Sequence, residues 1–434
     1  MRNYLLLALK ILQRHKFYTA ISLIGIAVTL MVLIVVTSLI ESFVHPNGPE
    51  ANSEQFLVAG MITMIQRGED ANQMSRSSNM LGYRFVESGV LNMQTPELIS
   101  VFWGSIGGRA GSLKVAGFRN GVKILSAAKR TDANYWKILR FEFLEGRPIS
   151  QQEHEQGAYV VVINETTRNL YFPGEAAVGK RLTLDGIAYD VIGVVKDVSP
   201  LQTLAVSDVW MPIFAIASTQ FRSEDRGTFM VLLQARTPAD LPRIQEEYQV
   251  VVRNFKPLAP PWFSADHPME VYSFALSKIG LYLHLVSGRT DLPPDQSDIG
   301  PLVISSLGIA MLVFMMLPVM NLVNINVSRI LDRASEIGVR KSFGASSGHL
   351  VQQFIIENLV VTGLGGVLGF ALAVAALALI GGTGLLPNES FQFNYRVFAL
   401  GLAYIFIFGL LSAVYPAWKM SRLDPVRALK GAVA

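Results

Sequence analysis

The chain has 434 residues, of which 51% are hydrophobic and 16% charged, and its formal net charge is +4. This composition is too apolar for an ordinary soluble protein and too polar for a protein that lies wholly within a membrane. The absence of cysteine excludes disulfides, thiolate catalysis and cysteine metal sites. Because the apolar residues are segregated along the chain, we expect membrane spans joined to a water-facing domain.

The first apolar run follows a basic N-terminal segment. Residues 1–16 predict an amphipathic helix that leads into the membrane, and residues 17–44 predict the first span. A cleaved signal peptide is the competing interpretation, but the apolar core is too long and no small-x-small cleavage site follows it. Residues 301–327, 350–382 and 396–417 are also long enough to cross a bilayer as helices, which takes about 20 residues. The sequence therefore predicts four transmembrane helices.

Residues 45–300 have a different character, because charges return and proline and glycine interrupt shorter apolar runs. No window in this region is long enough to span a membrane. Runs rich in β-branched residues predict strands, and polar segments with helical periodicity predict helices between them. The expected strands are residues 158–163, 181–184, 189–195 and 208–212, and the expected helices are residues 164–172 and 241–255. The mixture predicts a large α+β domain.

Several residues inside the predicted spans stand out. Pro318 should kink the second span, because proline removes a helical hydrogen bond. Gly365 and Gly369 form a G-x-x-x-G spacing that lets another helix approach closely; the spacing is common by chance and supports a dimer interface only weakly. Glu357 either lies within the membrane, where it needs a partner, or sits at the interface where the third span begins.

The charged segment between the second and third spans, residues 328–349, contains a tightly patterned run. Glu336 lies four residues before Arg340, the favourable order for an ion pair on a helix surface. Gly344 suits a left-handed helix stop, and Ser346 or Ser347 can cap the next helix. The pattern predicts a short helix, a sharp stop and a second helix at one membrane face. A solvated turn is the alternative from the pattern alone.

The distribution of positive charge predicts the orientation in the membrane. The short loop of residues 383–395 contains no Lys or Arg, whereas three other flanks of the spans are basic. With an even number of spans those flanks share one side, and their charge makes that side cytoplasmic. Both termini, including the tail of residues 418–434, are expected inside and the large domain outside, and the clustering argues against nucleic-acid binding. The basic residues are Arg2, Lys10, Arg14, Lys16, Arg329, Arg333, Arg340, Lys341, Lys419, Arg422, Arg427 and Lys430.

One segment matches part of a nucleotide-binding motif but is not expected to bind nucleotide. Residues 174–180 fit G-x-x-x-x-G-K, but Arg181 follows where a phosphate-binding loop needs Ser or Thr, and the next residues predict a strand. We therefore expect a turn at this position. The six histidines show no metal-ligand spacing, and the chain contains no recognisable catalytic constellation.

The run EIGVRKSFGAS, followed by QFIIE and then G-x-x-x-G, closely resembles the loop of MacB/FtsX-type ABC transporter permeases. The pieces NYWKILRFEFLEGRP, VVVINE, AVGKRL and IGVVKD resemble the extracytoplasmic domain of the MacB type, and YPAWKMSRLDPVRAL matches the family ending. The resemblance fades in residues 47–121 and 218–297. It implies that the first and last parts of the domain form one subdomain beside the membrane, with a second one inserted at about residues 122–205.

The resemblance implies a permease subunit of the bacterial inner membrane whose coupling helix docks on a separate ABC ATPase. ATP and Mg would be bound by that partner, so this chain is expected to be non-catalytic and to hold no cofactor or metal. Packing and relay within the membrane are expected from Pro318, Glu357, Gly365 and Gly369. The expected ATPase-coupling residues are Glu336, Ile337, Gly338, Arg340, Lys341, Phe343 and Gly344.

Further partners follow from the same resemblance. An ATPase dimer has two docking grooves, so two permease copies, identical or paralogous, are expected, with membrane lipids around them and an adaptor or lipoprotein outside. The expected work is mechanotransmission, used either for export of drugs or peptides or for extraction of lipoproteins or lipids. FtsX-like signalling to a cell-wall hydrolase and a membrane-anchored extracytoplasmic sensor or enzyme remain as alternatives.

Overall fold

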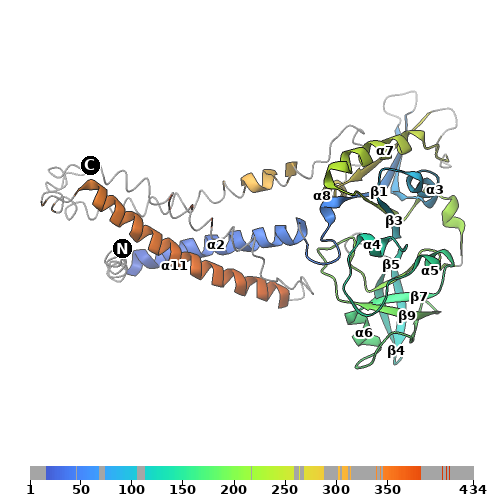
Figure 1. Cartoon of the computed structure of the whole chain (residues 1–434), viewed down its shortest axis with the longest axis horizontal. Helices are drawn as coiled ribbons and strands as arrows, with labels where there is room; N and C mark the ends of the chain where they lie inside the picture. Colours follow the sequence, from blue (N-terminus) through green and yellow to red (C-terminus); the bar gives the residue numbers. More distant parts are fainter. Residues whose placement is uncertain are drawn as a thin grey trace. The chain divides into compact units, whose positions relative to one another are not determined.

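The chain divides into two compact units, shown in a computed structural model (Figure 1). The helical unit comprises Met1–Glu41, Ile304–Leu385 and Ser390–Ala434, and the β-rich unit comprises Ser42–Val303 and Leu386–Glu389. The structure describes residues 16–44, 46–67, 74–104, 113–216, 218–258, 263, 268–287, 302–303, 305–310, 313, 339, 343, 346–382, 403, 407 and 410.

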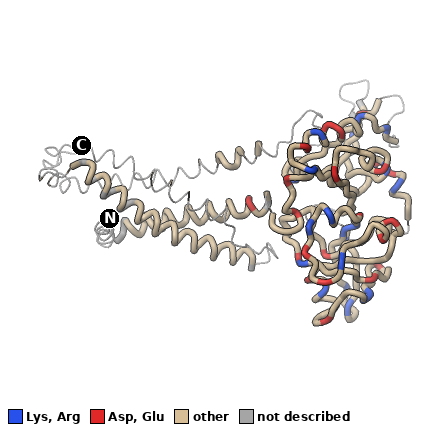
Figure 2. Tube along the Cα trace, in the orientation of Figure 1, with Lys and Arg blue, Asp and Glu red and all other residues tan. Residues whose placement is uncertain are grey.

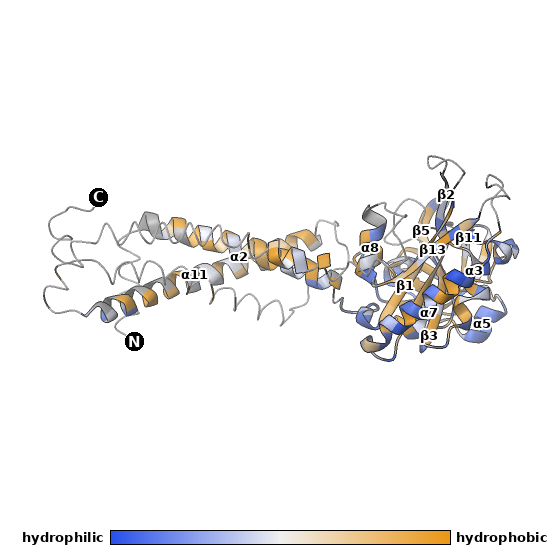
Figure 3. Ribbon diagram, turned by 90° about the horizontal axis from the view of Figure 1, so that it is seen from above, coloured by the Kyte–Doolittle hydropathy of each residue, from blue (hydrophilic) through white to orange (hydrophobic). Residues whose placement is uncertain are grey.

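Two long apolar helices dominate the described part of the helical unit. Helix α2 (Lys16–Val44) and helix α11 (Ser347–Gly382) contain the candidate membrane spans Thr19–Ser42 and Leu359–Gly381. Both helices are almost free of charge and strongly hydrophobic (Figures 2 and 3). The described residues thus include the first and third predicted spans, while the second and fourth lie mostly outside them.

Strands of the β-rich unit join into one continuous sheet. Their order along the chain gives β1 (Phe56–Arg67), β2 (Met74–Leu81), β3 (Leu98–Trp103), β4 (Lys114–Arg119), β5 (Val122–Thr131), β6 (Phe143–Gly146), β7 (Val160–Asn164), β8 (Arg181–Leu184), β9 (Ile187–Val195), β10 (Val209–Pro212), β11 (Arg226–Gly227), β12 (Phe229–Gln234) and β13 (Met269–Leu276). The helices between them are α3 (Tyr83–Ser88), α4 (Tyr135–Ile138), α5 (Gln151–Glu155), α6 (Glu165–Tyr171) and α7 (Leu241–Asn254), and α8 (Lys278–Ser287) follows the last strand.

The first and last parts of the β-rich unit form a split β-α-β-β-α-β arrangement. Its strands lie in the order β13–β1–β12–β3, each antiparallel to its neighbour, and α3 and α7 are the two crossovers. These segments are far apart in the sequence but adjacent in the sheet. We call this part the split domain.

The segment between β3 and β12 forms a second part, which we call the β-ring. Its strands follow the order β10–β7–β9–β8–β4–β5, and a parallel pairing of β10 with β5 closes the circuit. Helix α6 lies beside the ring (Figure 1). The ring runs from Lys114 to Pro212, which is wider at both ends than the predicted insertion of residues 122–205. The reason is that β4 pairs with β5 across the turn at Asn120 and Gly121, while β10 supplies the closing strand.

Alternation of side chains along the central strands divides the interior into separate clusters. In β12, Phe229, Val231 and Leu233 enter the cluster under α3 and α7, whereas Met230 and Leu232 enter the cluster between the split domain and the ring. In β7, Val161 and Ile163 face the interior of the ring, and Val160 and Val162 face the same middle cluster. Both strands are therefore buried on both faces, which explains their continuous apolar runs.

The elements predicted for this unit are confirmed. Residues 158–163, 181–184, 189–195 and 208–212 correspond to β7, β8, β9 and β10, and residues 164–172 and 241–255 correspond to α6 and α7. Asn164 begins α6 by accepting a hydrogen bond from the backbone N–H of Thr167 at 2.8 Å. The described β-rich unit is α+β, as expected from its composition.

Candidate functional site

The predicted coupling run is described at Val339 and Phe343. The backbone N–H of Phe343 donates to the carbonyl oxygen of Val339 at 3.1 Å, which is one turn of helix. The Phe343 side chain is 88% exposed and Val339 is 43% exposed. The ring of Phe343 is therefore accessible in the described part of this run. Outside the described residues lie Glu336, Ile337, Gly338, Arg340, Lys341, Gly344 and Pro318.

A side-chain cap begins the long helix that follows the turn. The Ser346 hydroxyl accepts a hydrogen bond from the backbone N–H of His349 at 3.3 Å, and it lies 3.0 Å from the Nδ1 atom of the same residue. Of the two serines expected to cap this helix, Ser346 does so, and α11 begins at Ser347, three residues before the predicted span. Glu357 belongs to the helical backbone and precedes the apolar segment Leu359–Gly381, and its side chain lies outside the described atoms.

The two glycines of α11 lie against α2 of the same chain. A Cβ added at Gly365 would stand 2.7 Å from Cγ2 of Ile26, and one added at Gly369 would stand 2.8 Å from the carbonyl oxygen of Ala27. At Gly369 only glycine permits this approach to the backbone of α2, and at Gly365 a larger residue would displace Ile26. The spacing is thus accounted for by a contact within one chain, without a second copy.

The order of these contacts gives the direction of the helices. Gly365 meets Ile26, Gly369 meets Ala27 and Leu30, and Ala373 clusters with Ile34. Because the contacts advance together along both helices, α2 and α11 run in the same direction. Two parallel spans would require a return crossing between them, and the span predicted for it, residues 301–327, lies mostly outside the described residues.

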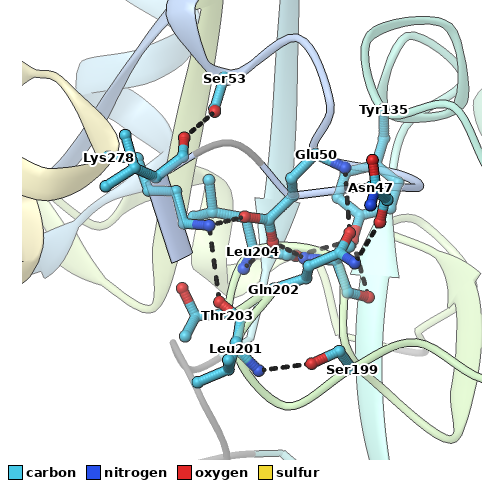
Figure 4. A network of polar contacts seen from close by, with 12 residues as sticks. Asn47, Glu50, Ser53, Tyr135, Ser199, Leu201, Gln202, Thr203, Leu204 and Lys278 are labelled. Atoms are coloured by element: carbon cyan, nitrogen blue, oxygen red, sulfur yellow. Dashed lines mark hydrogen bonds and ion pairs between the residues drawn. The ribbon is translucent and has the colours of Figure 1, made fainter. Parts of the chain in front are cut away.

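A buried polar network, the junction, joins three segments of the β-rich unit (Figure 4). Its centre is Glu50, which is fully buried in the segment after α2. One carboxylate oxygen accepts hydrogen bonds from the backbone N–H groups of Leu204 and Ala205 at 2.7 and 2.9 Å. The other lies 2.6 Å from Nζ of Lys278, the first residue of α8, which is 5% exposed.

The loop of residues 199–205, between β9 and β10, receives further hydrogen bonds in the junction. The side chain of Gln202 accepts from the backbone N–H of Glu50 at 3.2 Å and donates to the carbonyl oxygen of Asn47 at 2.7 Å. From the other side, Nζ of Lys129 on β5 donates to the carbonyl oxygen of Thr203 at 3.1 Å and also to that of Leu204. The loop is therefore held through its backbone from several directions.

Burial strongly perturbs the ionisable groups around the junction. It lowers the pKa of Lys129 to about 7, and the negative charge of Glu50 partly opposes this shift. The pKa of Tyr135 is raised by burial, and its hydroxyl donates to the carbonyl oxygen of Leu204 at 2.8 Å. Asp132 has a pKa raised to about 6 by burial, although it accepts hydrogen bonds from Ser100, Val101 and Tyr135.

Sequence reasoning missed the junction because Glu50 and Lys278 lie in the two regions without recognisable motifs. A usable signal exists: each is a charged residue close to an apolar span, Glu50 inside the turn PNGPE and Lys278 at the start of an apolar helix. The turn at residues 174–180 behaves as predicted, since β8 follows it directly and Lys180 pairs with Glu175 on the surface.

Comparison with known proteins identifies both halves of the chain. Residues 19–250 match the MacB-like periplasmic core domain, and residues 308–425 match the FtsX-like permease C-terminal domain. An uncharacterized ABC transporter permease of Bacillus subtilis, YknZ, is 24% identical over 296 residues, which is 68% of each chain. The macrolide export ATP-binding/permease protein MacB of Marinobacter nauticus is 28% identical over 299 residues, covering 68% of this chain but 41% of its own length.

Among solved structures, the periplasmic region of MacB from Actinobacillus actinomycetemcomitans matches with 13% identity and a TM-score of 0.34, covering 53% of this chain and 94% of that one. Apolar spans, an inserted extracellular domain and both family matches define the class as a permease of the ABC transporter type. The chain belongs to the MacB/FtsX family of these permeases, and it matches only the permease part of the MacB proteins.

Proposed function

We propose that this permease couples ATP hydrolysis by a separate ATPase subunit to conformational work in the β-rich unit. The observation that carries the proposal is the exposure of Phe343, 88%, one turn before a helix that packs glycine against backbone on α2. An ATPase that pushes on the Phe343 side chain would move α11, and the glycine contact would pass that movement to α2. Glu336 and Arg340 would orient the coupling turn, and Phe343 would fill a groove in the ATPase.

The proposed complex contains an ATPase dimer and two permease copies, identical or paralogous, in the bacterial inner membrane. Basic flanks of the spans favour cytoplasmic termini, with the β-rich unit outside. Such a relay needs two discrete arrangements of the permease that differ in their affinity for the nucleotide-bound ATPase. The work would be done outside the membrane rather than through a solute pore.

We propose export of drugs or peptides, or extraction of lipoproteins or lipids, as the use of this work. Support comes from the size of the β-rich unit, which has a split domain and a closed ring with their own cores. Signalling to a cell-wall hydrolase is the second candidate. The proteins that accompany the complex distinguish them, since an adaptor or lipoprotein indicates transport and a hydrolase indicates signalling.

Co-purification tests the coupling proposal. The tagged full chain is extracted from its own cells in mild detergent, beside a Glu336→Ala/Phe343→Ala variant, and the bound proteins are identified. We expect an ABC ATPase with the native chain and at least tenfold less with the variant, equivalent to about 1.4 kcal/mol of binding free energy.

Phe118→Ala is the matched control, because Phe118 is also an exposed phenylalanine, 65% accessible, but lies in the β-ring. It should retain the ATPase. If the coupling variant also retains the full amount, the coupling assignment is wrong. If no ATPase accompanies the native chain under any detergent or nucleotide condition, the proposed ATPase coupling itself fails.

A further inference from the structure

The junction lies where the β-rich unit continues toward its membrane spans. Glu50 follows the end of α2 by a few residues, and the Ser53 hydroxyl donates back to the carbonyl oxygen of Val44 at 3.4 Å. Lys278 begins α8, the last described helix before the second predicted span. The ion pair between them, 2.6 Å long, therefore ties the segment leaving the first span to the segment approaching the second.

The loop of residues 199–205 belongs to the β-ring, because it connects β9 with β10. Its backbone N–H groups at Leu204 and Ala205 bind Glu50, and its carbonyl oxygen at Leu201 lies 3.5 Å from Nζ of Lys278. Both tied segments therefore bond to this loop, and the first of them also bonds to the ring at Arg140, whose backbone N–H donates to the carbonyl oxygen of Pro49 at 3.0 Å. On its other side, Lys129 bonds the loop carbonyls and so carries the connection into β5.

The contacts of the junction fix the position of the loop relative to the segments that contain Glu50 and Lys278. Apolar surfaces can slide with little change in energy, whereas a buried carboxylate must keep its specific donors or remain unpaired in a medium of low dielectric constant. A buried ion pair is also weak evidence for a role in stability alone, because apolar residues of similar volume often replace it without loss. Glu50 and Lys278 are 0% and 5% exposed. Leu204, whose N–H bonds Glu50, and Leu281, three residues after Lys278, both belong to a buried apolar cluster.

We propose that Glu50 and Lys278 are positioning residues that make the loop of residues 199–205 the transfer point through which movement of the span-connected segments reaches the β-ring. The inference rests on the proposed function, because it presumes that nucleotide on an ATPase moves the spans. It names the element that converts this movement into rearrangement of the ring relative to the split domain.

Paired spin labels on the full chain, in complex with its ATPase, test the proposal. The chain contains no cysteine, so every introduced cysteine is a unique labelling site. Val28→Cys with Val367→Cys reports on α2 and α11, and Val122→Cys with Val250→Cys reports on the ring and α7, all at exposed positions. Distances are measured by pulsed electron paramagnetic resonance with no nucleotide, with ATP and with ADP–vanadate.

In the otherwise native chain we expect both label pairs to change distance with nucleotide. In the Glu50→Gln/Lys278→Met variant, which removes both charges together, the pair on the helices should still respond while the response of the ring pair falls at least threefold. An unchanged ring response overturns the inference. If the helix pair of the native chain does not respond, the proposed function fails instead and the inference falls with it.

Two further variants distinguish a loss of transmitted movement from a defect in folding. Neutralising the exposed pair of Arg181 and Asp190 on the ring, by Arg181→Gln/Asp190→Asn, should leave both responses intact. Gln202→Leu keeps the ion pair but removes the bonds to Glu50 and Asn47, and it replaces the double variant if that variant does not fold. We expect Gln202→Leu to reduce the ring response by about half, and a native-sized response in this variant overturns the inference.

Discussion

The two units of the chain are built by opposite packing rules. Where α11 meets α2 in the helical unit, the small residues Gly365, Gly369 and Ala27 lie at the contact, while large apolar side chains such as Val367 and Leu379 are 71% and 70% exposed. In the β-rich unit the largest fully buried side chains are mostly aromatic rings, and ionisable groups are buried as well. The difference follows from the solvent, because lipid gives apolar side chains no reason to leave the surface whereas water does.

The comparison also concerns polar groups. In the helical unit the contact between α2 and α11 is made by backbone and apolar groups. In the β-rich unit the junction is made by charged side chains held by hydrogen bonds. The helix contact depends on the absence of side chains at two glycines, whereas the junction depends on specific donors and acceptors. The following predictions test this contrast, beginning with the largest expected effect.

Removing one partner of the junction should be severe. Lys278→Met leaves the Glu50 carboxylate buried without its cation, and the loss of such a partner costs about 3–5 kcal/mol. The free energy of unfolding of the full chain in detergent, from denaturant titration, measures the effect. Adding Glu50→Gln to Lys278→Met should restore much of the loss, because no unpaired charge then remains. A single variant no less stable than the double variant would contradict this account.

The buried His154 should make the stability of the β-rich unit depend on pH. It is 7% exposed and stacked on Phe214 at 4.7 Å, and burial lowers its pKa from 6.5 to about 4. The charge of Glu155 and a hydrogen bond to the backbone of Thr131 partly oppose this shift, and the charge of Arg222 adds slightly to it. Between these pH values the unfolded chain binds a proton that the folded chain does not. The neutral histidine therefore contributes fully above pH 6.5, and this contribution is lost as the pH falls toward 4, by up to about 3 kcal/mol.

Unfolding free energies measured from pH 7 to pH 4 check this prediction. His154→Phe keeps an aromatic ring against Phe214 but has no proton to bind. The variant should show a smaller loss of stability over that window than the native chain. Equal slopes in the two proteins would show that His154 does not titrate as described.

The glycine contact between the helices should be sensitive to a single methyl group. Gly369→Ala places a Cβ 2.8 Å from the carbonyl oxygen of Ala27, so the helices must separate, and overpacking of this kind costs about 1–3 kcal/mol. Gly363→Ala is the control on the same helix, because a Cβ there meets nothing within 4 Å.

Disulfide formation between Ile34→Cys and Ala373→Cys measures the separation, since these residues share one cluster and no native cysteine competes. We expect the yield to fall several-fold with Gly369→Ala and to remain unchanged with Gly363→Ala. The same yield in both backgrounds would mean that α2 and α11 do not depend on this contact.

The smallest effect is expected at an exposed ion pair. Arg181 and Asp190 lie 3.1 Å apart on the ring with side chains 78% and 57% exposed. Asp190→Asn should therefore change the free energy of unfolding by less than about 1 kcal/mol, because water and salt screen the pair. A loss comparable to that of Lys278→Met would remove the distinction between buried and exposed pairs on which the junction rests.

Much of the secondary structure could be predicted because it is encoded locally. The β-branched runs at β7 and β9 and the apolar length of α2 and α11 need no distant partner to be recognised. The Ser346 cap and the turn before β8 were equally readable from residue type and spacing. The outer parts of the β-rich unit carried no motif, although they form the split domain, because its neighbouring strands come from opposite ends of the region.

The sequence by itself determined the class of the protein, the apolar spans at α2 and α11, and the α+β character of the β-rich unit. Only the tertiary structure decided that Gly365 and Gly369 meet α2, that β10 closes a ring on β5, and that Glu50 binds Lys278 across more than half the chain. The physical reason is that periodicity and length act within a few residues. A buried ion pair or a helix contact depends on the position of a partner that local patterns do not specify.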